Sequence, residues 1–377
     1  MVNLSHNSAV WVASRLNYYK IVTDQSNNLA SILCLVGILA NLVSAMVFLQ
    51  AEFRKLSMNV LLAARCISDV LLLFFALPVT ASDRLVEWLP SDWPIKPLIL
   101  VYFYPTGNVF HSNSTWLLVI ISFERWIAVC KPLKAVIYCT RKRAFCTVLV
   151  ILVFSILFNS CRYMEFSFDH HNYRLVPLLR RFDHYAFVYT VVLTTVCQYL
   201  VPLFFVCITS WRVSAKLRRR NQERHLLSRC QNSTATRTGT MLLYVVMSFI
   251  VSYSMASVLN LIEMMDHMVI FTPLFSCLSA VNNLLITANG ACNFFFYYRM
   301  SCKFRTKLHD IFCCRRPPDR GAKKRRPTLA RRKTSYSTGA RESRNGSFTW
   351  PFSFRCSTYG AVRVEDIGPI SVTSTTV

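Results

Sequence analysis

The sequence has few acidic residues and few charged residues of any kind for its length. Only 18 of its 377 residues are Asp or Glu, against 43 Lys or Arg, and charged residues together make up 16%. Soluble domains contain about a quarter charged residues. With 53% hydrophobic residues and a mean hydropathy of +0.35, the composition favours a membrane protein.

The sequence also lacks the patterns that common active sites need. It contains no metal-ligand spacing of Cys and His, no phosphate-binding loop and no nucleophile elbow. These absences predict that the chain is not an enzyme and carries no cofactor. The first 28 residues have no basic-then-apolar signal peptide, so we expect the first apolar segment to serve as its own insertion signal.

Seven long apolar runs dominate the rest of the chain. Runs of 17 or more apolar residues predict membrane-spanning helices. The runs are Leu29–Gln50, Met58–Thr80, Pro97–Ile121, Ala144–Ser160, Ala186–Ser210, Gly239–Ile262 and Phe271–Tyr298. Six contain no Lys, Arg, Asp or Glu, whereas the second contains Arg65 and Asp69. We predict an all-α membrane protein with one seven-helix bundle over residues 29–298.

The basic residues predict how this bundle is oriented. Loops 51–57, 122–143 and 211–238 and the tail from 299 carry 34 of the 43 Lys and Arg, and such loops stay on the cytoplasmic side. Residues 1–28 are then extracellular, and the chain is a multi-pass protein of the plasma membrane. The net charge of +25 belongs to the inner face, where it attracts anionic lipid and partner proteins, so nucleic acid is not a predicted partner.

The two ends of the chain carry sequence signals for modification and binding. Asn3 begins an extracellular glycosylation sequon. Residues 299–314 predict a short amphipathic helix on the membrane, and Cys313 and Cys314 follow it as a palmitoylation site. Residues 315–377 have the composition of a disordered tail, and the terminal Ser374–Val377 fits a PDZ-domain ligand.

Several motifs resemble those of the rhodopsin-family (class A) G-protein-coupled receptors. They are Gly37…Asn41, Leu62-Ala63…Asp69, Glu124-Arg125-Trp126, Pro202 and Asn289…Asn293…Tyr297. Their order and spacing agree over residues 29–312. Phe158–Phe166, Val258–Glu263 and the form of the Asn289–Tyr297 motif resemble more narrowly the invertebrate FMRFamide and related neuropeptide receptors. The resemblance implies a receptor that transmits binding of a peptide ligand to a heterotrimeric G protein, with arrestin as a further partner.

The resemblance assigns a G-protein switch to five residues. Arg125 pairs at rest with the neighbouring Glu124 and is released on activation, opening a cytoplasmic cavity for the G protein. Trp126 stands where the family has Tyr, and Asn293 and Tyr297 complete the set. Tyr297 is expected to support the active arrangement.

A second cluster is expected around Asp69, which lies in the middle of the membrane and must find partners there. The resemblance places Ser114, Asn289 and Asn293 around it. A carboxylate, a hydroxyl and two amides would suit an allosteric Na⁺, since hard cations prefer oxygen ligands. The alternative is a protonated Asp69 held by the same groups, or an Asp69 paired to Arg65 four residues away on the same helical face.

Three positions depart from the family pattern. Leu100 replaces the third-helix Cys of the outer disulfide, so Cys161 is expected to be a packing residue rather than a disulfide partner. Met255 replaces the sixth-helix proline, which predicts a straighter helix, with Tyr253 at the toggle position. Phe294 replaces the seventh-helix proline. These departures leave open a degenerate orphan receptor that signals weakly. A seven-helix transporter or channel is the rival class.

The ligand pocket is expected at the outer half of the bundle. Asp83, Glu165 and Glu263 would offer anionic partners to the cationic groups of an FMRFamide-like peptide, with Glu263 favoured. Each acid alone could also be a solvated loop charge, and His111 could be a hydrogen-bonded core residue. The full candidate set is Asp83, His111, Glu165, Gln198, Asn260, Glu263, Asn282 and Asn283. Because no Lys occurs between 271 and 298, a retinal Schiff base is excluded.

Overall fold

The computed structural model describes residues 6–88, 95–169, 174–225, 233–266, 269 and 272–312. The chain divides into two compact units, Met1–His309 and Asp310–Val377. The first unit holds the helical bundle. In the second only residues 310–312 are described, so Asn3, Cys313, Cys314 and the tail 315–377 lie outside the described residues.

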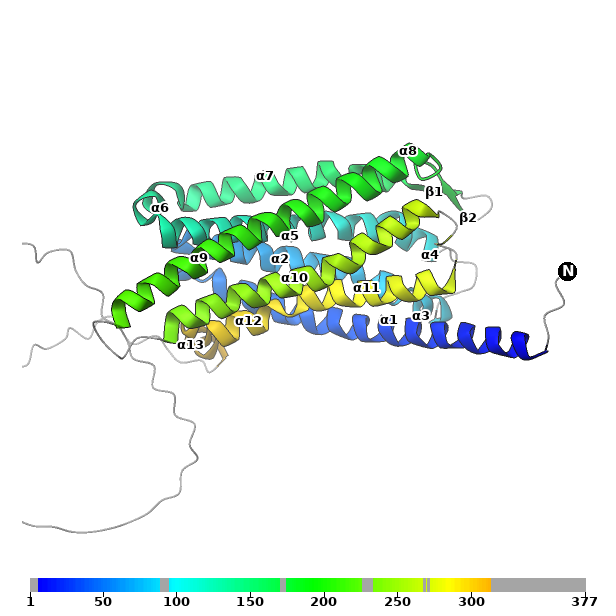
Figure 1. Cartoon of the computed structure of the whole chain (residues 1–377), viewed down its shortest axis with the longest axis horizontal. Coiled ribbons are helices and arrows are strands. Elements are labelled where there is room, and N and C mark those ends of the chain that lie inside the picture. Colours follow the sequence, from blue (N-terminus) through cyan, green and yellow to red (C-terminus); the bar gives the residue numbers. More distant parts are fainter. Residues whose placement is uncertain are drawn as a thin grey trace, which may run out of the picture. The chain divides into compact units, whose positions relative to one another are not determined.

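Seven long helical rods lie side by side in the described part of the first unit (Figure 1). The first two are α1 (His6–Phe48) and α2 (Ser57–Thr80). The third consists of α4 (Ile95–Leu98), the π-helical η2 (Ile99–Phe103) and α5 (Tyr104–Cys130), and the fourth of α7 (Arg141–Asn159) and the 3₁₀ turn η3 (Ser160–Met164). The fifth consists of α8 (Asp183–Tyr185), the π-helical η4 (Ala186–Leu193) and η5 (Thr195–Leu200), and α9 (Val201–His225). The sixth is α10 (Ser233–Met265), and the seventh is α11 (Pro273–Ala291) with α12 (Asn293–Met300).

Short elements lie at the two ends of the bundle (Figure 1). At one end, called here the hairpin end, lie α3 (Ser82–Trp88) and the antiparallel strands β1 (Phe166–Asp169) and β2 (Arg174–Pro177), with Phe166 opposite Pro177. At the other, called the α6 end, lie η1 (Phe53–Lys55), α6 (Pro132–Tyr138) and α13 (Cys302–Phe312). The predicted all-α bundle with a short eighth helix is therefore confirmed.

The described helices differ in length and in how apolar they are. Four described helices are long and apolar enough to cross a membrane: Ala13–Phe48, Ser57–Thr80, Arg141–Met164 and Thr195–Arg220. Met247–Glu263 is a shorter apolar stretch. The third rod is long but carries a buried row of polar side chains, among them Ser112, Asn113, Ser114 and Thr115, which lowers its mean hydropathy. The outward side chains of α7 are apolar, with Val150 and Leu157 each 66% exposed, as expected for a surface that faces lipid.

Three helix boundaries differ from the apolar runs. The first span was expected to begin at Leu29, but α1 begins at His6 because no proline interrupts the hydrogen-bonded ladder between His6 and Phe48. Likewise α9 continues to His225, and α10 begins at Ser233. Residues 6–28, expected to belong to an extracellular N-terminus, and much of the loop 211–238 are therefore helical, because apolar runs mark the segment that crosses a membrane and not the end of the helix.

The seventh rod breaks at Cys292 although it lacks the proline that the family has there. Cys292 has φ −73° and ψ −11° and ends α11, and α12 begins at Asn293. Phe294 occupies the proline position. In contrast α10 is continuous from Ser233 to Met265, which agrees with the absence of a proline at Met255.

The first, second and seventh rods approach closely at Gly37. A β-carbon built on Gly37 would lie 2.6 Å from Leu73 Cδ1 and 2.8 Å from Ala291 Cβ, so a larger residue would clash. One turn further along α1, the Asn41 side-chain amide donates to the carbonyls of Gly37 and Gly290 at 2.9 and 3.0 Å. The close packing and the two hydrogen bonds fix α1 against the break in the seventh rod.

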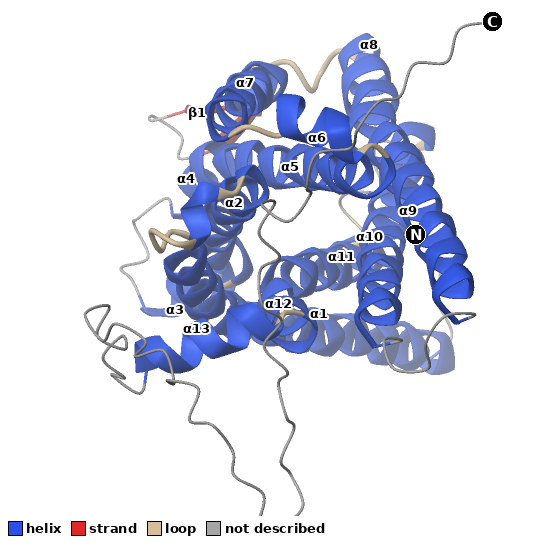
Figure 2. Ribbon diagram, turned by 90° about the vertical axis from the view of Figure 1, so that its left-hand side faces the viewer, coloured by secondary structure: helices blue, strands red, loops and turns tan. Residues whose placement is uncertain are grey.

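The helix α13 begins after an extended residue, Ser301, whose hydroxyl accepts a hydrogen bond from the Phe304 amide at 3.2 Å. Figure 2, seen from the α6 end, shows α13 turning away from the direction of α12. Phe304 is fully buried, with its ring 5.4 Å from Phe48 and 6.0 Å from Tyr297. This aromatic cluster fixes the start of the predicted amphipathic helix.

Candidate functional site

A cavity of about 430 Å³ lies at the hairpin end of the bundle, between α2, α5, η5, α10, α11 and the residues around the hairpin. This volume falls in the range of small-ligand sites, about 300–1,000 Å³. Its wall is mainly apolar and aromatic, with polar groups at a few positions. Of the expected ligand residues, it is lined by His111, Gln198, Asn260, Glu263, Asn282 and Asn283.

Two expected ligand residues do not line this cavity. Asp83 pairs instead with Lys96 at 2.6 Å, and about half of each side chain is exposed. Because Asp83 lies in the short helix α3, its carboxylate reaches a neighbouring surface charge. Glu165 is only 2% exposed and lies behind the cavity wall. Neither carboxylate lines the cavity.

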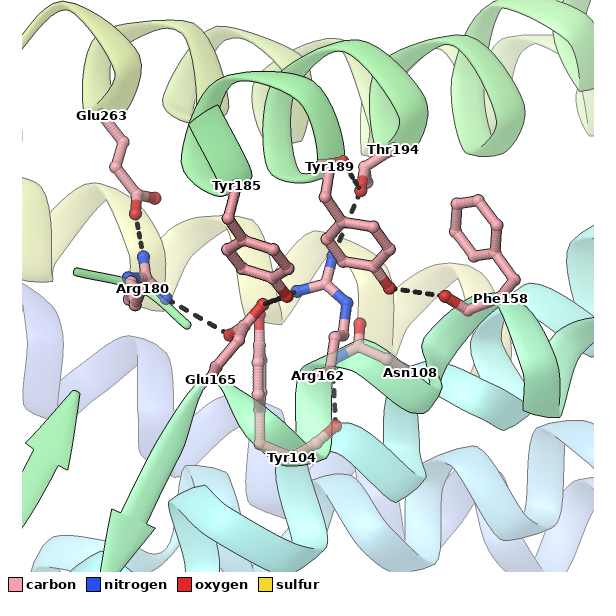
Figure 3. Close-up of polar contacts among 10 residues, drawn as sticks. All are labelled: Tyr104, Asn108, Phe158, Arg162, Glu165, Arg180, Tyr185, Tyr189, Thr194 and Glu263. Atoms are coloured by element: carbon pink, nitrogen blue, oxygen red, sulfur yellow. Dashed lines mark hydrogen bonds and ion pairs between the residues drawn. The ribbon is translucent and has the colours of Figure 1, made fainter. Parts of the chain in front are cut away.

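The acids near the cavity are already paired with arginines of the same chain (Figure 3). Arg180 forms an ion pair with Glu263 of α10 and lies 3.5 Å from the second carboxylate, Glu165. The other oxygen of Glu165 lies 3.6 Å from Arg162. The hairpin makes this possible, because Leu178 and Leu179 donate backbone hydrogen bonds to the residues that precede β1 and so bring Arg180 beside Glu165.

Tyr185 adds a hydrogen bond to this network, since its hydroxyl donates to Glu165 at 3.0 Å. Burial and the negative charge of Glu165 raise the pKa of the Tyr185 phenol well above its usual range. Tyr185 therefore keeps its proton and acts as a donor to the carboxylate. The network consists of Arg162, Glu165, Arg180, Tyr185 and Glu263.

Arg162 has several contacts but leaves one of its donors unpaired. Its guanidinium lies over the rings of Tyr189 and Tyr104, at 5.5 and 6.0 Å from their centres. It donates to the Thr194 hydroxyl at a long 3.4 Å, and its Nε has no hydrogen-bond partner among the described residues. Arg162 is 9% exposed and lines the cavity. A buried guanidinium with an unused donor is suited to a ligand group that accepts hydrogen bonds.

Sequence reasoning assigned no role to Arg162 or Arg180. Arg162 lies in the Phe158–Phe166 motif, and this membership was the one sequence feature that could have indicated a role for it. Arg180 lay in a loop of mixed charge and gave none. Ser112 of α5 accepts hydrogen bonds from Gln198 and, at 2.8 Å, from Asn159. These contacts join the third, fourth and fifth rods, which the sequence does not place together.

At its deep end the cavity is closed by stacked rings. Tyr253 of α10 stacks on Phe249 at 4.1 Å and on His111 of α5 at 5.1 Å, and its hydroxyl is hydrogen-bonded to Thr115. His111 and Tyr253 line both the large cavity and a small one beneath it, which also touches Asp69 and Asn289. The expected toggle residue thus separates the two cavities.

Asp69 is bonded on both carboxylate oxygens. Ser114 donates to Oδ1 at 2.5 Å, and Asn293 donates to Oδ2 at 2.7 Å. Arg65 Nε lies 3.9 Å from Oδ2, with both side chains buried. Asn289 lines the small cavity but forms no recorded hydrogen bond to Asp69. The expected cluster is thus assembled around Ser114 and Asn293, with Arg65 as an additional member.

At the α6 end the expected pair of Glu124 and Arg125 is not formed. Glu124 accepts a hydrogen bond from Ser57 at 3.0 Å, and no ion pair to Arg125 is recorded in the described part of the chain. The neighbouring Trp126 packs on Phe123 at 5.3 Å and lies under the Lys131 ammonium at 4.8 Å. Ser57, at the start of α2, is thus the hydrogen-bond partner of Glu124 in place of Arg125.

Of the two residues expected with Arg125, Tyr297 lies close enough to interact electrostatically with its guanidinium, whereas Asn293 belongs to the Asp69 cluster. Asn293 bonds Asp69, whereas Tyr297 is 5% exposed and packs edge-on against Phe48 at 5.1 Å. Among the described residues, the partner near its hydroxyl is the buried thiol of Cys66. Cys161 is a free thiol, as expected. The described residues contain no group of three or more His, Cys, Asp or Glu side chains that could hold a metal ion.

Comparison with known proteins gives one family and several relatives. Residues 28–315 match the family described as serpentine type 7TM GPCR chemoreceptor Srw. The FMRFamide peptide receptor frpr-18 of Caenorhabditis elegans is 29% identical over 338 residues, which cover 84% of this chain and 76% of that receptor. The FMRFamide receptor of Drosophila melanogaster is 27% identical over 308 residues, 76% of this chain but only 54% of that receptor. The allatostatin-A receptor of Bombyx mori is 25% identical over 310 residues, 76% of this chain and 79% of that receptor.

Proposed function

Because the chain belongs to the serpentine seven-transmembrane G-protein-coupled receptor family, we propose that it is a receptor for an FMRFamide-like neuropeptide. The family and the relatives are multi-pass membrane receptors. The names of its relatives in the nematode and the fly support the peptide ligand. The peptide binds in the cavity at the hairpin end, and a heterotrimeric G protein binds at the α6 end.

The observation that carries this proposal is the shared wall of the two cavities. His111 and Tyr253 line the ligand cavity on one side and the Asp69 cavity on the other. A ligand that displaces the Tyr253 ring must move α10 or the hydroxyl bond to Thr115 of α5. Movement beneath it acts on Asp69 and, through Asn293, on α12. The signal then reaches Tyr297, one turn further along α12, and Arg125 at the α6 end.

The paired acids define how a cationic peptide is recognised. Glu263 lines the cavity but is bonded to Arg180, so a ligand guanidinium binds it only by displacing Arg180 toward Glu165. At the same time the guanidinium of Arg162, a residue of the cavity wall, offers a hydrogen bond to a carbonyl oxygen of the peptide. The ligand therefore supplies both a cation and a hydrogen-bond acceptor.

Orientation and finer partners belong to the same proposal. The α6 end faces the cytoplasm because η1, α6 and the neighbouring loop ends carry Arg54, Lys55, Lys131 and Lys134, and residue 1 is extracellular. Glycosylation at Asn3, palmitoylation at Cys313 and Cys314, arrestin, a PDZ protein at Ser374–Val377 and anionic lipid are proposed from the sequence.

The test is a dose–response measurement in cells that express the full chain with a promiscuous G protein. We expect amidated FMRFamide-type peptides to elicit a saturable signal. Arg125→Ala should abolish the signal at unchanged surface expression. Asp83→Asn, which alters a carboxylate outside the cavity, is the matched control and should leave peptide potency unchanged.

Two other outcomes decide between the remaining functions. A surface-expressed receptor that gives no signal to any peptide of this class would contradict the proposal and favour the degenerate orphan receptor. Solute or ion flux that is lost in Asp69→Asn, without G-protein activation, would favour the transporter or channel. No contact described above favours that second class.

A further inference from the structure

Arg65 and Asp69 form a buried charged pair on one face of α2. Arg65 is 6% exposed and Asp69 is 1% exposed. The two lie one helical turn apart, which places their side chains on the same face, with Arg65 Nε 3.9 Å from Asp69 Oδ2. Arg65 does not extend to the α6 end of its helix, since it lines the small cavity together with Asp69, Ser114 and Asn289.

The groups around Asp69 present hydrogen-bond donors. Ser114 donates its hydroxyl to Oδ1, and Asn293 donates its amide to Oδ2. The orientation of the Asn293 amide is supported by a second acceptor, because its nitrogen also lies 3.4 Å from the Gly290 carbonyl. A metal ion at Asp69 needs oxygen lone pairs that point toward it. In this arrangement, two of the three expected partner side chains point hydrogens at the carboxylate.

The charge at this site is also already balanced. A guanidinium cannot lose its proton in a protein, so Arg65 supplies a permanent positive charge to Asp69. A second cation in the same small cavity would lie beside Arg65 in a region of low dielectric, where like charges repel strongly. The cavity measures about 10 Å³, room for about one water molecule. The residues present therefore do not fit a sodium ion.

We propose that the guanidinium of Arg65 is the built-in counter-ion of Asp69, and that it excludes sodium from the core of this receptor. A diffusible ion can leave when the receptor changes conformation, whereas a side chain can only rearrange. Asp69 thus remains neutralised in every state of the receptor, independently of the sodium concentration. The inference uses no property of the ligand and stands apart from the proposed peptide recognition.

The test compares thermal unfolding of the purified full-length receptor in NaCl, KCl and choline chloride at equal ionic strength. We expect the Tm of the unmodified receptor to be the same in all three salts. Arg65→Met leaves Asp69 without a counter-ion and opens space beside it. Its Tm should be lower in choline chloride and should rise saturably with NaCl.

Two further variants control for general effects. Arg65→Met combined with Asp69→Asn removes both charges, so it should lose the sodium response and recover stability relative to the single variant. Arg54→Met removes an exposed arginine of η1 and should behave like the unmodified receptor in every salt. If Arg65→Met alone does not fold, recovery of folded protein in the double variant with Asp69→Asn supports the proposal that Arg65 neutralises Asp69.

The inference is overturned by either of two results. One is a Tm of the unmodified receptor that rises in NaCl but not in choline chloride and loses this response in Asp69→Asn. The other is a folded Arg65→Met receptor whose Tm shows no preference for sodium, since Arg65 would then not be what keeps sodium out. The first measurement needs no variant that could fail to fold.

Discussion

The guanidinium of Arg180 bonds the carboxylate of Glu263 and so joins the segment after β2 to the last turn of α10. The side chains are 24% and 14% exposed, and Arg180 also lies 3.5 Å from Glu165. Its guanidinium lies over the Phe166 ring at 5.4 Å. One arginine thus connects the hairpin to the helix that is expected to move on activation.

Breaking this connection should weaken the fold at the hairpin end. Glu263→Gln keeps the shape of the side chain but removes its charge, so we expect a loss of about 1–2 kcal/mol, because hydrogen bonds to charged groups are worth about 1.5–3 kcal/mol and partial exposure reduces that value. Thermal unfolding of Glu263→Gln, Arg180→Gln and the double variant measures the coupling. Strictly additive losses would show that the pair contributes nothing.

Arg162 should matter more for the ligand than for stability. If its guanidinium binds a peptide carbonyl, Arg162→Gln removes a charge-assisted hydrogen bond worth about 1.5–3 kcal/mol, which corresponds to roughly a 10–100-fold loss of peptide potency. Arg162→Lys should recover little, because an ammonium cannot lie between Tyr104 and Tyr189 as a planar guanidinium does. Dose–response curves at matched surface expression measure both.

The matched control for Arg162 is Arg84→Gln, which removes an exposed arginine of α3 at the same end of the bundle. Its potency should equal that of the unmodified receptor. Equal potency of Arg162→Gln and Arg84→Gln would remove Arg162 from the ligand site.

Tyr253 should act through its hydroxyl as well as its ring. Tyr253→Phe keeps the stacking on Phe249 and His111 but loses the bond to Thr115. We expect a lower maximal response and a loss of stability of about 1 kcal/mol. Tyr199→Phe is the control, since its hydroxyl lies a long 3.4 Å from Ser254. Dose–response curves and thermal unfolding of both variants test this, and a normal maximal response in Tyr253→Phe would assign the coupling to the ring alone.

The sequence predicts contacts between residues that are close along the chain, or that belong to a family motif, better than it predicts contacts between distant residues. The Arg65–Asp69 pair is readable from a four-residue spacing, and the alternative stated for Asp69 included it. The bonds of Ser114 and Asn293 to Asp69 followed from the family resemblance. The contact of Arg180 with Glu263 did not, because the two residues lie 83 positions apart, with the whole fifth rod and most of α10 between them. The break at Cys292 was also hidden, because the proline that would signal it is absent.

The packing at Gly37 gives a prediction that is independent of the ligand. Gly37→Ala places a methyl group 2.6 Å from Leu73 Cδ1 and 2.8 Å from Ala291 Cβ, so two helices must shift. Overpacking of this kind costs about 1–3 kcal/mol. Gly107→Ala is the matched control, because its nearest neighbour, Phe75 Cβ, lies at an ordinary 3.7 Å. Thermal unfolding and surface expression compare the two, and equal stability would contradict the close approach of α1 to α2 and α11.

The contact of Glu124 with Ser57 makes a distinct prediction about basal signalling. If Glu124 held Arg125 in an ion pair, Glu124→Gln would release the arginine and raise signalling without ligand. In this structure Glu124 instead accepts a hydrogen bond from Ser57, and a glutamine oxygen can accept the same bond. Glu124→Gln should therefore change basal signalling little. Ser57→Ala should have an equally small effect on basal signalling. Arg125→Ala should still abolish the response to peptide.

The measurement is G-protein activation without and with peptide at matched surface expression. A severalfold rise in basal signalling in Glu124→Gln alone would show that the two charges pair in the resting receptor.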